Sequence, residues 1–286
     1  MSEMQLPQGQ VAALTPAAPG PADIEQKAEA AAVTKANLQI GKMFVLAMFA
    51  GAFIAFGAAF FVMFLGDTTL TFAAQRVLGG LLFCLGLVLV LCCGAELFTG
   101  NCLMITGVMS KKISFGGMLK NWVVVWIGNL AGALLIVFFL YMSNLQGMNG
   151  GAVGDQFVSV ALGKVTLAPA TLFFKGIMCN IFVCLAVWIG FAAKNVADKV
   201  IGILLPIGAF VAMGFEHCVA NMFFLNMGLV CKEIGGFGAD LANVAALNMG
   251  GVCYNLALAT LGNIVGGVVF VGLAYWYCYH KPVAAK

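Results

Sequence analysis

Two groups of ionisable residues lie inside long apolar segments of this chain. Glu216 and His217 stand together in one segment, and Glu96 stands in another, three residues before Thr99. Ionisable groups buried among apolar residues at membrane depth usually face a cavity or a partner. An imidazole can donate or accept a hydrogen bond and titrates near neutral pH, so His217 is a candidate contact for a transported species. The alternative for His217 is structural, a hydrogen bond that locks an interrupted helix.

The neighbouring polar residues fit an interruption in each helix. Thr99 offers a hydroxyl and nearby backbone N–H groups at a helix start, where anions are favoured. An ordinary N-cap is compatible with that role. Glu96 and Glu216 are each followed five residues later by Asn101 and Asn221. A carboxylate at a break can accept hydrogen bonds from freed backbone N–H groups, so we expect a structural role for these four residues.

The composition indicates a membrane protein. Of the 286 residues, 63% are hydrophobic and 9% are charged, and the mean hydropathy is +1.04. Soluble globular domains carry roughly a quarter charged residues. The net charge of +3 comes from lysines and arginines scattered between apolar runs, so we expect no nucleic-acid partner.

Cysteines and histidines give no pattern typical of a metal centre. The ten cysteines show no CxxC spacing, and most lie inside apolar runs, where they pack as small hydrophobes. His217 and His280 are the two histidines, whereas a metal site needs clustered Cys or His. We therefore expect no metal, no cofactor and no catalytic residues, and the chain lacks the nucleophile–base pairing of an enzyme.

Six apolar runs could cross a membrane, and two of them are too long for one straight helix. The second run has 33 residues, which would reach ~50 Å as a helix, against a hydrocarbon core of ~30 Å. Each long run is predicted to be one span with a break in the middle, at Glu96 or at Glu216. The runs are residues 43–65, 77–109, 118–142, 168–193, 200–230 and 252–278.

Motifs repeat between the two halves of the chain. Gly94, Ala95 and Glu96 with Asn101 match residues 214–216 with Asn221, and the segments 128–132 and 262–266 are also alike. Two three-span halves joined in one chain run in opposite directions, which predicts inverted repeats over residues 43–142 and 168–278. The predicted fold is all-α, with six transmembrane helices of which the second and fifth are broken. The binding site should lie where the two breaks meet.

The remaining segments set the expected domain organisation and orientation. Residues 1–36 are expected to form a cytoplasmic tail, with an amphipathic helix from Asp23 continuing to about Lys42. Residues 43–280 form a single transmembrane domain, and residues 281–286 form a second cytoplasmic tail. With both termini inside, most lysines fall on the inner side, and Arg76, Lys164 and Lys232 fall outside. Lys175, inside the fourth span, has no role that the sequence explains.

Several motifs resemble those of the formate/nitrite transporter family. They are AELFTGN at residues 95–101, GIMCNIFVCLAVW at 176–188 and GFEHCVANM at 214–222, supported by residues 120–122, 128–129 and 261–263. The resemblance covers about residues 38 to 280, with the motifs in the family's order. It implies an aquaporin-like fold in the inner membrane, assembled as a homopentamer with one pore in each protomer.

The resemblance also implies roles for particular residues. Thr99, His217 and Asn180 would lie on the substrate pathway, and Lys164 would raise the local anion concentration. Two apolar constrictions would be lined by Phe83, Leu87, Leu97, Phe98 and Phe210. Since a bare anion crosses an apolar constriction at high cost, the anion would be neutralised by a proton relayed at or near His217.

The implied substrates are small monovalent anions of weak acids. Formate and nitrite come first, with hydrosulfide as an alternative and with acetate or lactate as further substrates. A proton-coupled monocarboxylate symporter is a second class that fits the same residues. An aquaporin is disfavoured because neither break contains Asn-Pro-Ala.

Overall fold

The computed structural model describes residues 18–67 and 69–281, and all regular elements among these residues are helices. Five helical segments are long and apolar enough to cross a membrane. They are Ile40–Leu65, Phe72–Gly94, Phe115–Met142, Pro169–Ala192 and Met249–Tyr279. The fifth predicted span is divided between α11 (Val196–Ala212) and α12 (Cys218–Glu233), which are each shorter than a full span. The protein is an all-helical polytopic membrane protein whose second and fifth spans are broken.

The two halves of the chain contain corresponding helices. The first half contains α2 (Pro21–Ala36), α3 (Ile40–Leu65), α4 (Phe72–Phe83), α5 (Leu85–Leu89), α6 (Phe98–Asn101), α7 (Ile105–Met109) and α8 (Phe115–Met142). The second contains α9 (Ala152–Val165), α10 (Pro169–Ala192), α11, α12, α13 (Met249–Gly267) and α14 (Ala274–Tyr279). A π-helical turn at Val268–Leu273 joins α13 to α14.

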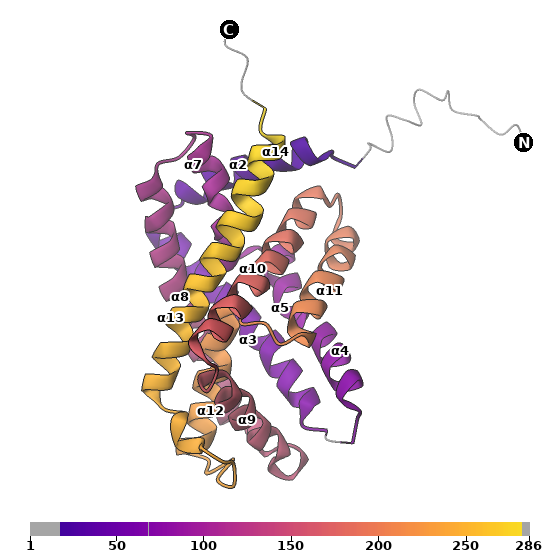
Figure 1. Cartoon of the computed structure of the whole chain (residues 1–286), viewed down its shortest axis with the longest axis vertical. Coiled ribbons are helices and arrows are strands. Elements are labelled where there is room, and N and C mark those ends of the chain that lie inside the picture. The colour runs from indigo at the N-terminus through magenta and orange to yellow at the C-terminus, as the bar shows by residue number, and fades with distance from the viewer. Residues whose placement is uncertain (1–17, 68, 282–286) are drawn as a thin grey trace, which may run out of the picture.

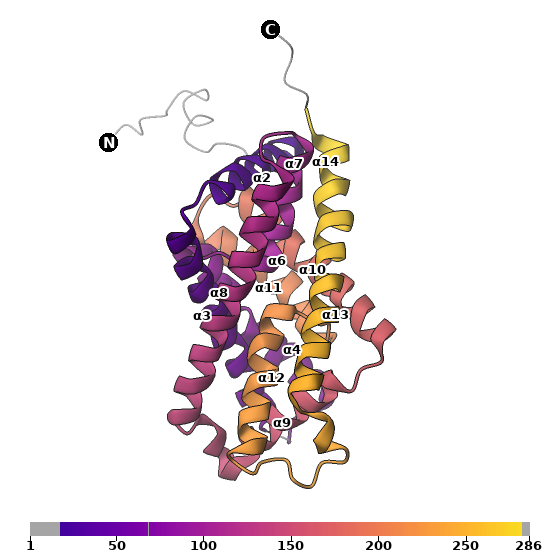
Figure 2. The ribbon, with the colours of Figure 1, turned by 90° about the vertical axis from the view of Figure 1, so that its left-hand side faces the viewer.

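Corresponding helices run in opposite directions. In Figure 1, α3 runs away from the end of the molecule that carries α2, whereas α10 runs toward that end. Helix α8 likewise runs away from this end, whereas α13 and α14 run toward it. These helices lie along the long axis in both views (Figures 1 and 2). Opposite directions of corresponding helices are expected of an inverted repeat.

Glycines allow the closest helix pairs to approach each other. A Cβ atom on Gly51 of α3 would collide with the backbone of Asn129 on α8. A Cβ atom on Gly266 of α13 would collide in the same way with the carbonyl of Ile177 on α10. Small residues at such contacts are typical of membrane helix pairs, which lack a hydrophobic driving force between them. The α3–α8 pair and the α10–α13 pair therefore form the rigid frame around the two broken spans.

Two elements differ from the sequence-based expectations. Helix α2 ends at Ala36, with Asn37 as its C-cap, and α3 begins at Ile40, so the predicted continuation of one helix to Lys42 is wrong. The chain turns at residues 37–39 because α2 lies across the end of the bundle, whereas α3 runs along its axis (Figure 1). The sequence analysis assigned no element to residues 143–167, where the structure contains α9 at Ala152–Val165.

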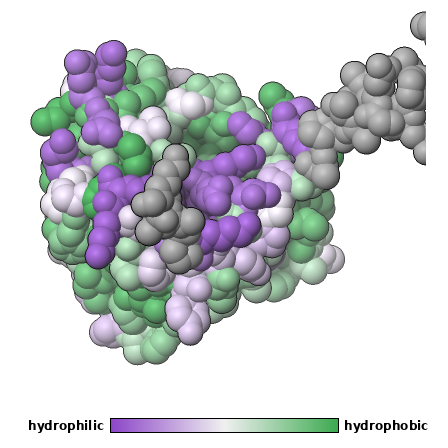
Figure 3. Space-filling view, turned by 90° about the horizontal axis from the view of Figure 1, so that it is seen from above, coloured by the Kyte–Doolittle hydropathy of each residue, from purple (hydrophilic) through white to green (hydrophobic). Residues whose placement is uncertain are grey.

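The surface matches a protein surrounded by lipid or by other subunits. Large apolar side chains such as Phe72, Leu205 and Tyr277 are exposed on the flanks of the bundle. Viewed from the end that carries α2 and α14, hydrophilic residues gather on the end face, and hydrophobic side chains surround much of its periphery (Figure 3). Apolar flanks with a polar end face are expected of a protein that spans a bilayer.

Candidate permeation site

Both broken spans are interrupted in the same way. The first is interrupted after Gly94 (φ 85°), and its backbone is extended at Ala95 before α6 begins at Phe98. The second is interrupted after Gly214 (φ 70°), and α12 begins at Cys218. Glycine adopts this left-handed conformation without the steric cost that a Cβ atom would add. The N-cap positions of the two restarted helices are Leu97 and His217.

An asparagine on α8 holds the first break. The Oδ1 atom of Asn129 accepts a hydrogen bond of 3.0 Å from the N–H of Phe98. Its Nδ2 donates to the carbonyls of Glu96 at 2.9 Å and Ala47 at 2.8 Å. A break at membrane depth leaves backbone groups that must find partners within the protein. Asn129 supplies these partners from a neighbouring helix.

Asn263 on α13 performs the same task at the second break. Its Oδ1 accepts a hydrogen bond of 2.8 Å from the N–H of Cys218. Its Nδ2 donates to the carbonyls of Glu216 at 2.9 Å and Gly176 at 2.8 Å. The GN dipeptides that repeat in the sequence are therefore the anchors of both breaks.

The two glutamates bind side chains and not the freed backbone N–H groups that we expected. Glu96 accepts from Lys35 Nζ at 2.7 Å and from Asn101 Nδ2 at 2.8 Å. Asn101 also donates to Asn121 Oδ1 at 2.8 Å. The N–H of Phe98 is bound by Asn129 and the N–H of Glu96 by the carbonyl of Leu46, so the carboxylate of Glu96 is free to neutralise Lys35. Glu96 therefore belongs to a network of polar side chains at the break.

The second half repeats this network with its own residues. Glu216 accepts from Lys164 Nζ at 2.8 Å and from Asn221 Nδ2 at 2.7 Å. Asn221 donates to Asn255 Oδ1 at 2.7 Å, and Asn255 donates back to the carbonyl of Lys164 at 3.0 Å. In the first half, Asn121 donates in the same way to the carbonyl of Lys35, at 3.3 Å.

The two halves meet at a hydrogen bond between Thr99 and His217. The hydroxyl of Thr99 lies 2.8 Å from His217 Nε2, and both side chains are buried. His217 Nδ1 accepts from the N–H of Ala220 at 3.0 Å, so the proton of the neutral ring resides on Nε2 and is donated to Thr99. His217 is therefore the N-cap of α12 and also faces the other half. Thr99 does not cap α6, because Leu97 holds that position.

Asn180 on α10 lies beside this pair. Its Nδ2 donates to the carbonyls of Thr99 at 3.2 Å and Asn263 at 2.7 Å. Its Oδ1 is buried and has no hydrogen-bond partner among the described residues. The structure thus brings together Thr99, His217 and Asn180, which the sequence placed on one pathway.

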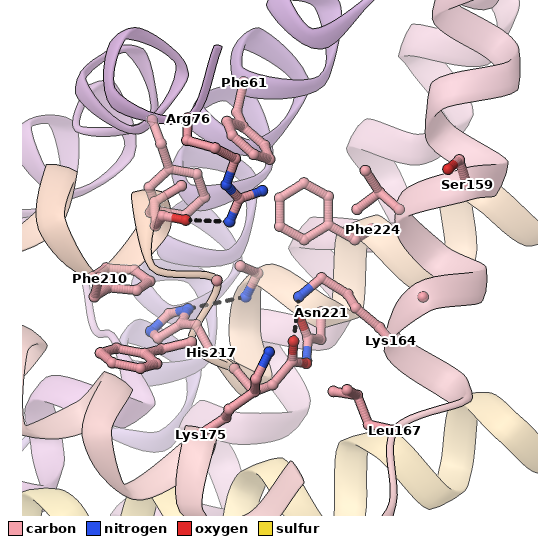
Figure 4. Close-up of a pocket in the computed structure, with 18 residues that line it drawn as sticks. Phe61, Arg76, Ser159, Lys164, Leu167, Lys175, Phe210, His217, Asn221 and Phe224 are labelled. Carbon is pink, nitrogen blue, oxygen red and sulfur yellow. Dashed lines mark hydrogen bonds and ion pairs between the residues drawn. The ribbon is translucent and has the colours of Figure 1, made fainter. Parts of the chain in front are cut away.

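A cavity of about 220 Å³ opens beside His217, and we call it the Lys164 cavity. Arg76, Lys164 and Lys175 reach it from α4, α9 and α10, and Phe210 and His217 lie on the opposite wall (Figure 4). Lys164 is tied to Glu216, and the guanidinium of Arg76 donates to backbone carbonyls. The Nζ atom of Lys175 makes no ion pair or hydrogen bond to any described residue. This cavity therefore carries excess positive charge.

A second cavity lies on the other side of the breaks, with a volume of about 530 Å³, and we call it the Lys35 cavity. Lys35 and Glu96 line it, and α2 forms one of its walls. Between the two cavities lies a central cavity of about 10 Å³, close to the space for one water molecule. It borders His217 and is otherwise apolar.

Four of the five predicted constriction residues line the central cavity. Phe83 and Phe210 also line the Lys164 cavity, and their rings pack edge to face at 5.8 Å. Leu87 and Leu97 also line the Lys35 cavity. Phe83 and Phe210 thus form an apolar pair on the side of the Lys164 cavity, and Leu87 and Leu97 form one on the side of the Lys35 cavity.

Phe98 does not line the central cavity. It is buried against Trp122, with the ring centroids 6.0 Å apart, and it borders an apolar groove between α8 and α13. Its side chain follows the first turn of α6 toward α8, because its backbone N–H is held by Asn129.

Sequence reasoning did not single out Lys35 or Arg76 as site residues. A signal for Lys35 was present, since Lys35 and Lys164 each lie five residues before the first residue of a long span, α3 or α10. Arg76 directly precedes the second apolar run and Lys175 lies inside the fourth, and only the fold shows that they face the same cavity.

Comparison with known proteins agrees with this geometry. The sequence model of the family described as "Formate/nitrite transporter" matches residues 22–277. The chain belongs to the formate/nitrite transporter family. Membership in the formate/nitrite transporter family, together with the apolar spans, makes it an integral membrane protein.

Relatives and a solved structure extend this membership over nearly the whole chain. The formate channel FocA of Escherichia coli K12 is 36% identical, covering 91% of this chain and 94% of that protein. A probable formate transporter of Methanothermobacter thermautotrophicus is 38% identical, covering 91% and 97%. A solved structure described as a pentameric formate channel with formate bound is 39% identical, with a TM-score of 0.76, covering 85% of this chain and 98% of that one. These members of the formate/nitrite transporter family are named as channels or transporters.

Proposed function

We propose that this chain forms a homopentameric channel that conducts formate, with nitrite and hydrosulfide as competing substrates. The relatives named above support formate as the first candidate. The observation that carries the proposal is the hydrogen-bonded pair of Thr99 and His217 at an apolar central cavity, with a lysine-lined cavity on each side.

The apolar pairs oppose passage of a bare anion. Moving an ionised carboxylate into a low-dielectric environment without compensating partners is heavily penalised. The neutral acid avoids this cost, so the permeating form between Phe83 and Leu97 is formic acid. His217 is the ionisable side chain at the central cavity, and its Nε2–H already points to the Thr99 hydroxyl. A proton from the solvent of the flanking cavities, passed through this pair so that His217 is reprotonated as it releases its Nε2–H, would neutralise formate where the pathway is narrowest.

The lysines on both sides would concentrate the anion before it is protonated. Lys164 and Lys35 stand at equivalent positions of the two networks, each held by a glutamate. Cationic clefts raise the local concentration of anionic substrates. Asn180, with its free Oδ1, would accept a hydrogen bond from the protonated acid.

The same relatives and the distribution of charge support the proposed assembly and location. Each protomer would form its own pore in the inner membrane, within a single domain of residues 43–280. The start of α2 and the end of α14 lie at the same end of the molecule (Figure 1). The excess of lysines at this end favours a cytoplasmic location for both termini.

The test is flux into proteoliposomes that contain the purified chain. Formate, nitrite and hydrosulfide are compared in parallel over a range of external pH. We expect formate flux to be the fastest and to increase with acidity, and we expect Thr99→Ala to lower it by at least ~10-fold. The matched control is Thr106→Ala, a buried threonine whose hydroxyl bonds only to the carbonyl of Leu103.

Other outcomes would change the assignment. If nitrite or hydrosulfide passes much faster than formate, the pore remains but the substrate assignment is wrong. Saturable formate flux with a fixed proton stoichiometry would favour a symporter. If none of the three anions passes, the channel function is overturned.

A further inference from the structure

Outside the permeation site, three potential ligands converge where α2 meets the end of α14. Glu25 and Glu29 lie one helical turn apart on α2, and His280 follows the last residue of α14. His280 Nδ1 lies 3.0 Å from Glu29 Oε1 and 4.0 Å from Glu25 Oε1. One ligand atom from each of the three side chains lies within 4.8 Å of the others.

Glu25 is the residue that needs an explanation. Its side chain is fully buried, and neither carboxylate oxygen has a hydrogen-bond partner among the described residues. Burying a carboxylate without a partner is costly, so buried charges are normally paired or coordinate a metal. The side chain is directed into the cluster, with Oε1 toward His280.

The other two ligands are held in place by their neighbours. Glu29 accepts hydrogen bonds from Lys112 and Ser110. Ser110 in turn accepts from Trp276 Nε1 at 2.8 Å and lies 3.4 Å from His280 Nδ1. Partners that fix the orientation of ligand side chains are typical of metal sites.

We propose that Glu25, Glu29 and His280 bind a divalent transition-metal cation, such as Zn²⁺ or Co²⁺. Two carboxylates and one imidazole form a donor set that suits these ions. Ligand atoms bonded to such an ion at ~2.0–2.2 Å are at most ~4 Å apart, so small side-chain rotations close the site. The sequence predicted no metal site because His280 lies 251 residues from Glu29 in the chain and the other two ligands are glutamates.

The charge of the cluster also favours a cation. Lys112 neutralises Glu29, but its side chain is 42% exposed and it does not reach Glu25. The negative charge of the Glu25 carboxylate is therefore not compensated by Lys112. Without a metal Glu25 would hold a proton, because burial and then the nearby charge of Glu29 raise the pKa of Glu25 to about 8.

Bound metal would join the first described helix to the last. Helix α2 forms a wall of the Lys35 cavity through Ala28, Ala32 and Lys35. Glu25 and Glu29 are on the same helix, so the cation would fix α2 over this cavity by connecting it to His280.

The test is Co²⁺ titration of the full-length protein, stripped of metal with EDTA and followed by the visible absorption of Co²⁺. Exposed Cys93, Cys253 and Cys278 are first replaced by serine, because thiols also bind Co²⁺. We expect saturable binding of one ion per chain. Glu25→Gln and His280→Gln should each weaken binding by at least ~10-fold. Glu233→Gln, an exposed glutamate paired with Lys232, should leave it unchanged.

A second measurement keeps the proposal testable if the variants do not fold. Zn²⁺ should raise the midpoint of thermal unfolding of the unmodified protein, whereas Mg²⁺ at the same concentration should not. Equal Co²⁺ binding by the wild type and Glu25→Gln would overturn the proposal. So would the lack of any Zn²⁺-dependent shift, which would leave a proton as the occupant.

Discussion

His217 uses its two ring nitrogens for different tasks, and a substitution can separate them. In His217→Asn, the asparagine Oδ1 can still cap α12 by accepting from the N–H of Ala220, since asparagine is a good N-cap. Its shorter amide cannot titrate and does not reach Thr99. We expect a folded protein whose formate flux is lower by at least ~10-fold at acidic pH and depends less on pH, measured in proteoliposomes.

The outcome distinguishes the two roles of the histidine. If His217→Asn retains both the rate and the pH dependence of the wild type, His217 serves only as a cap and the proton comes from elsewhere. A loss of flux with an altered elution volume of the oligomer would instead indicate damage to the helix break.

Some residue-level features could be predicted and others could not. The repeated GxE and Asn spacing was enough to expect that the two breaks meet, whereas the roles of Thr99 and His217 on one pathway were implied by the family resemblance. The partners of the glutamates could not be predicted. Lys35 lies 61 residues from Glu96 in the chain, and only the fold brings the two together.

The two breaks differ in how much room surrounds their glycines, and this gives a prediction for the broken spans. A Cβ atom on Gly94 would meet nothing within 4 Å, so Gly94→Ala should cost only the backbone strain, about 1 kcal/mol. A Cβ atom on Gly214 would lie 2.9 Å from Arg76, so Gly214→Ala should destabilise more and displace this guanidinium. Thermal unfolding in detergent measures both.

A third glycine provides the control. Gly41 lies in the first turn of α3 with nothing near its Cβ position, so Gly41→Ala should be neutral or slightly stabilising. If Gly94→Ala and Gly214→Ala lower the unfolding midpoint equally, contact with Arg76 does not matter at the second break.

Long apolar elements were easier to predict than short ones. The six spans follow from runs of apolar residues, and the breaks follow from runs too long for one span and too short for two. Helix α9 has 14 residues with Asp155 and Lys164 among them, below the length and hydropathy of a span. Its helical state depends on packing against α12, which no local pattern reveals.

The two cavities give the whole molecule an uneven charge. Arg76, Lys164 and Lys175 face one cavity, where Glu216 pairs with Lys164, whereas Lys35 and Glu96 balance each other at the other. We expect Lys175→Gln to raise the half-saturating formate concentration by roughly two- to fivefold at low ionic strength, because less anion gathers in the Lys164 cavity.

Ionic strength and a surface lysine test whether charge is the cause. The effect of Lys175→Gln should shrink toward 1 M salt, where the Debye length is ~3 Å. Lys194→Gln removes an exposed lysine outside both cavities and should leave formate flux unchanged. A salt-independent effect would mean that Lys175 acts through packing and not through its charge.

The duplicated hydrogen-bond network has a consequence for the ancestry of the protein. Each half holds its own break with its own lysine, glutamate and asparagines, as expected if one ancestral chain inserted into the membrane in both orientations and paired with itself. Such a pair would have had identical residues at its centre. Duplication and fusion of such a chain would have removed this constraint, and the equivalent N-cap positions hold an apolar Leu97 and an ionisable His217.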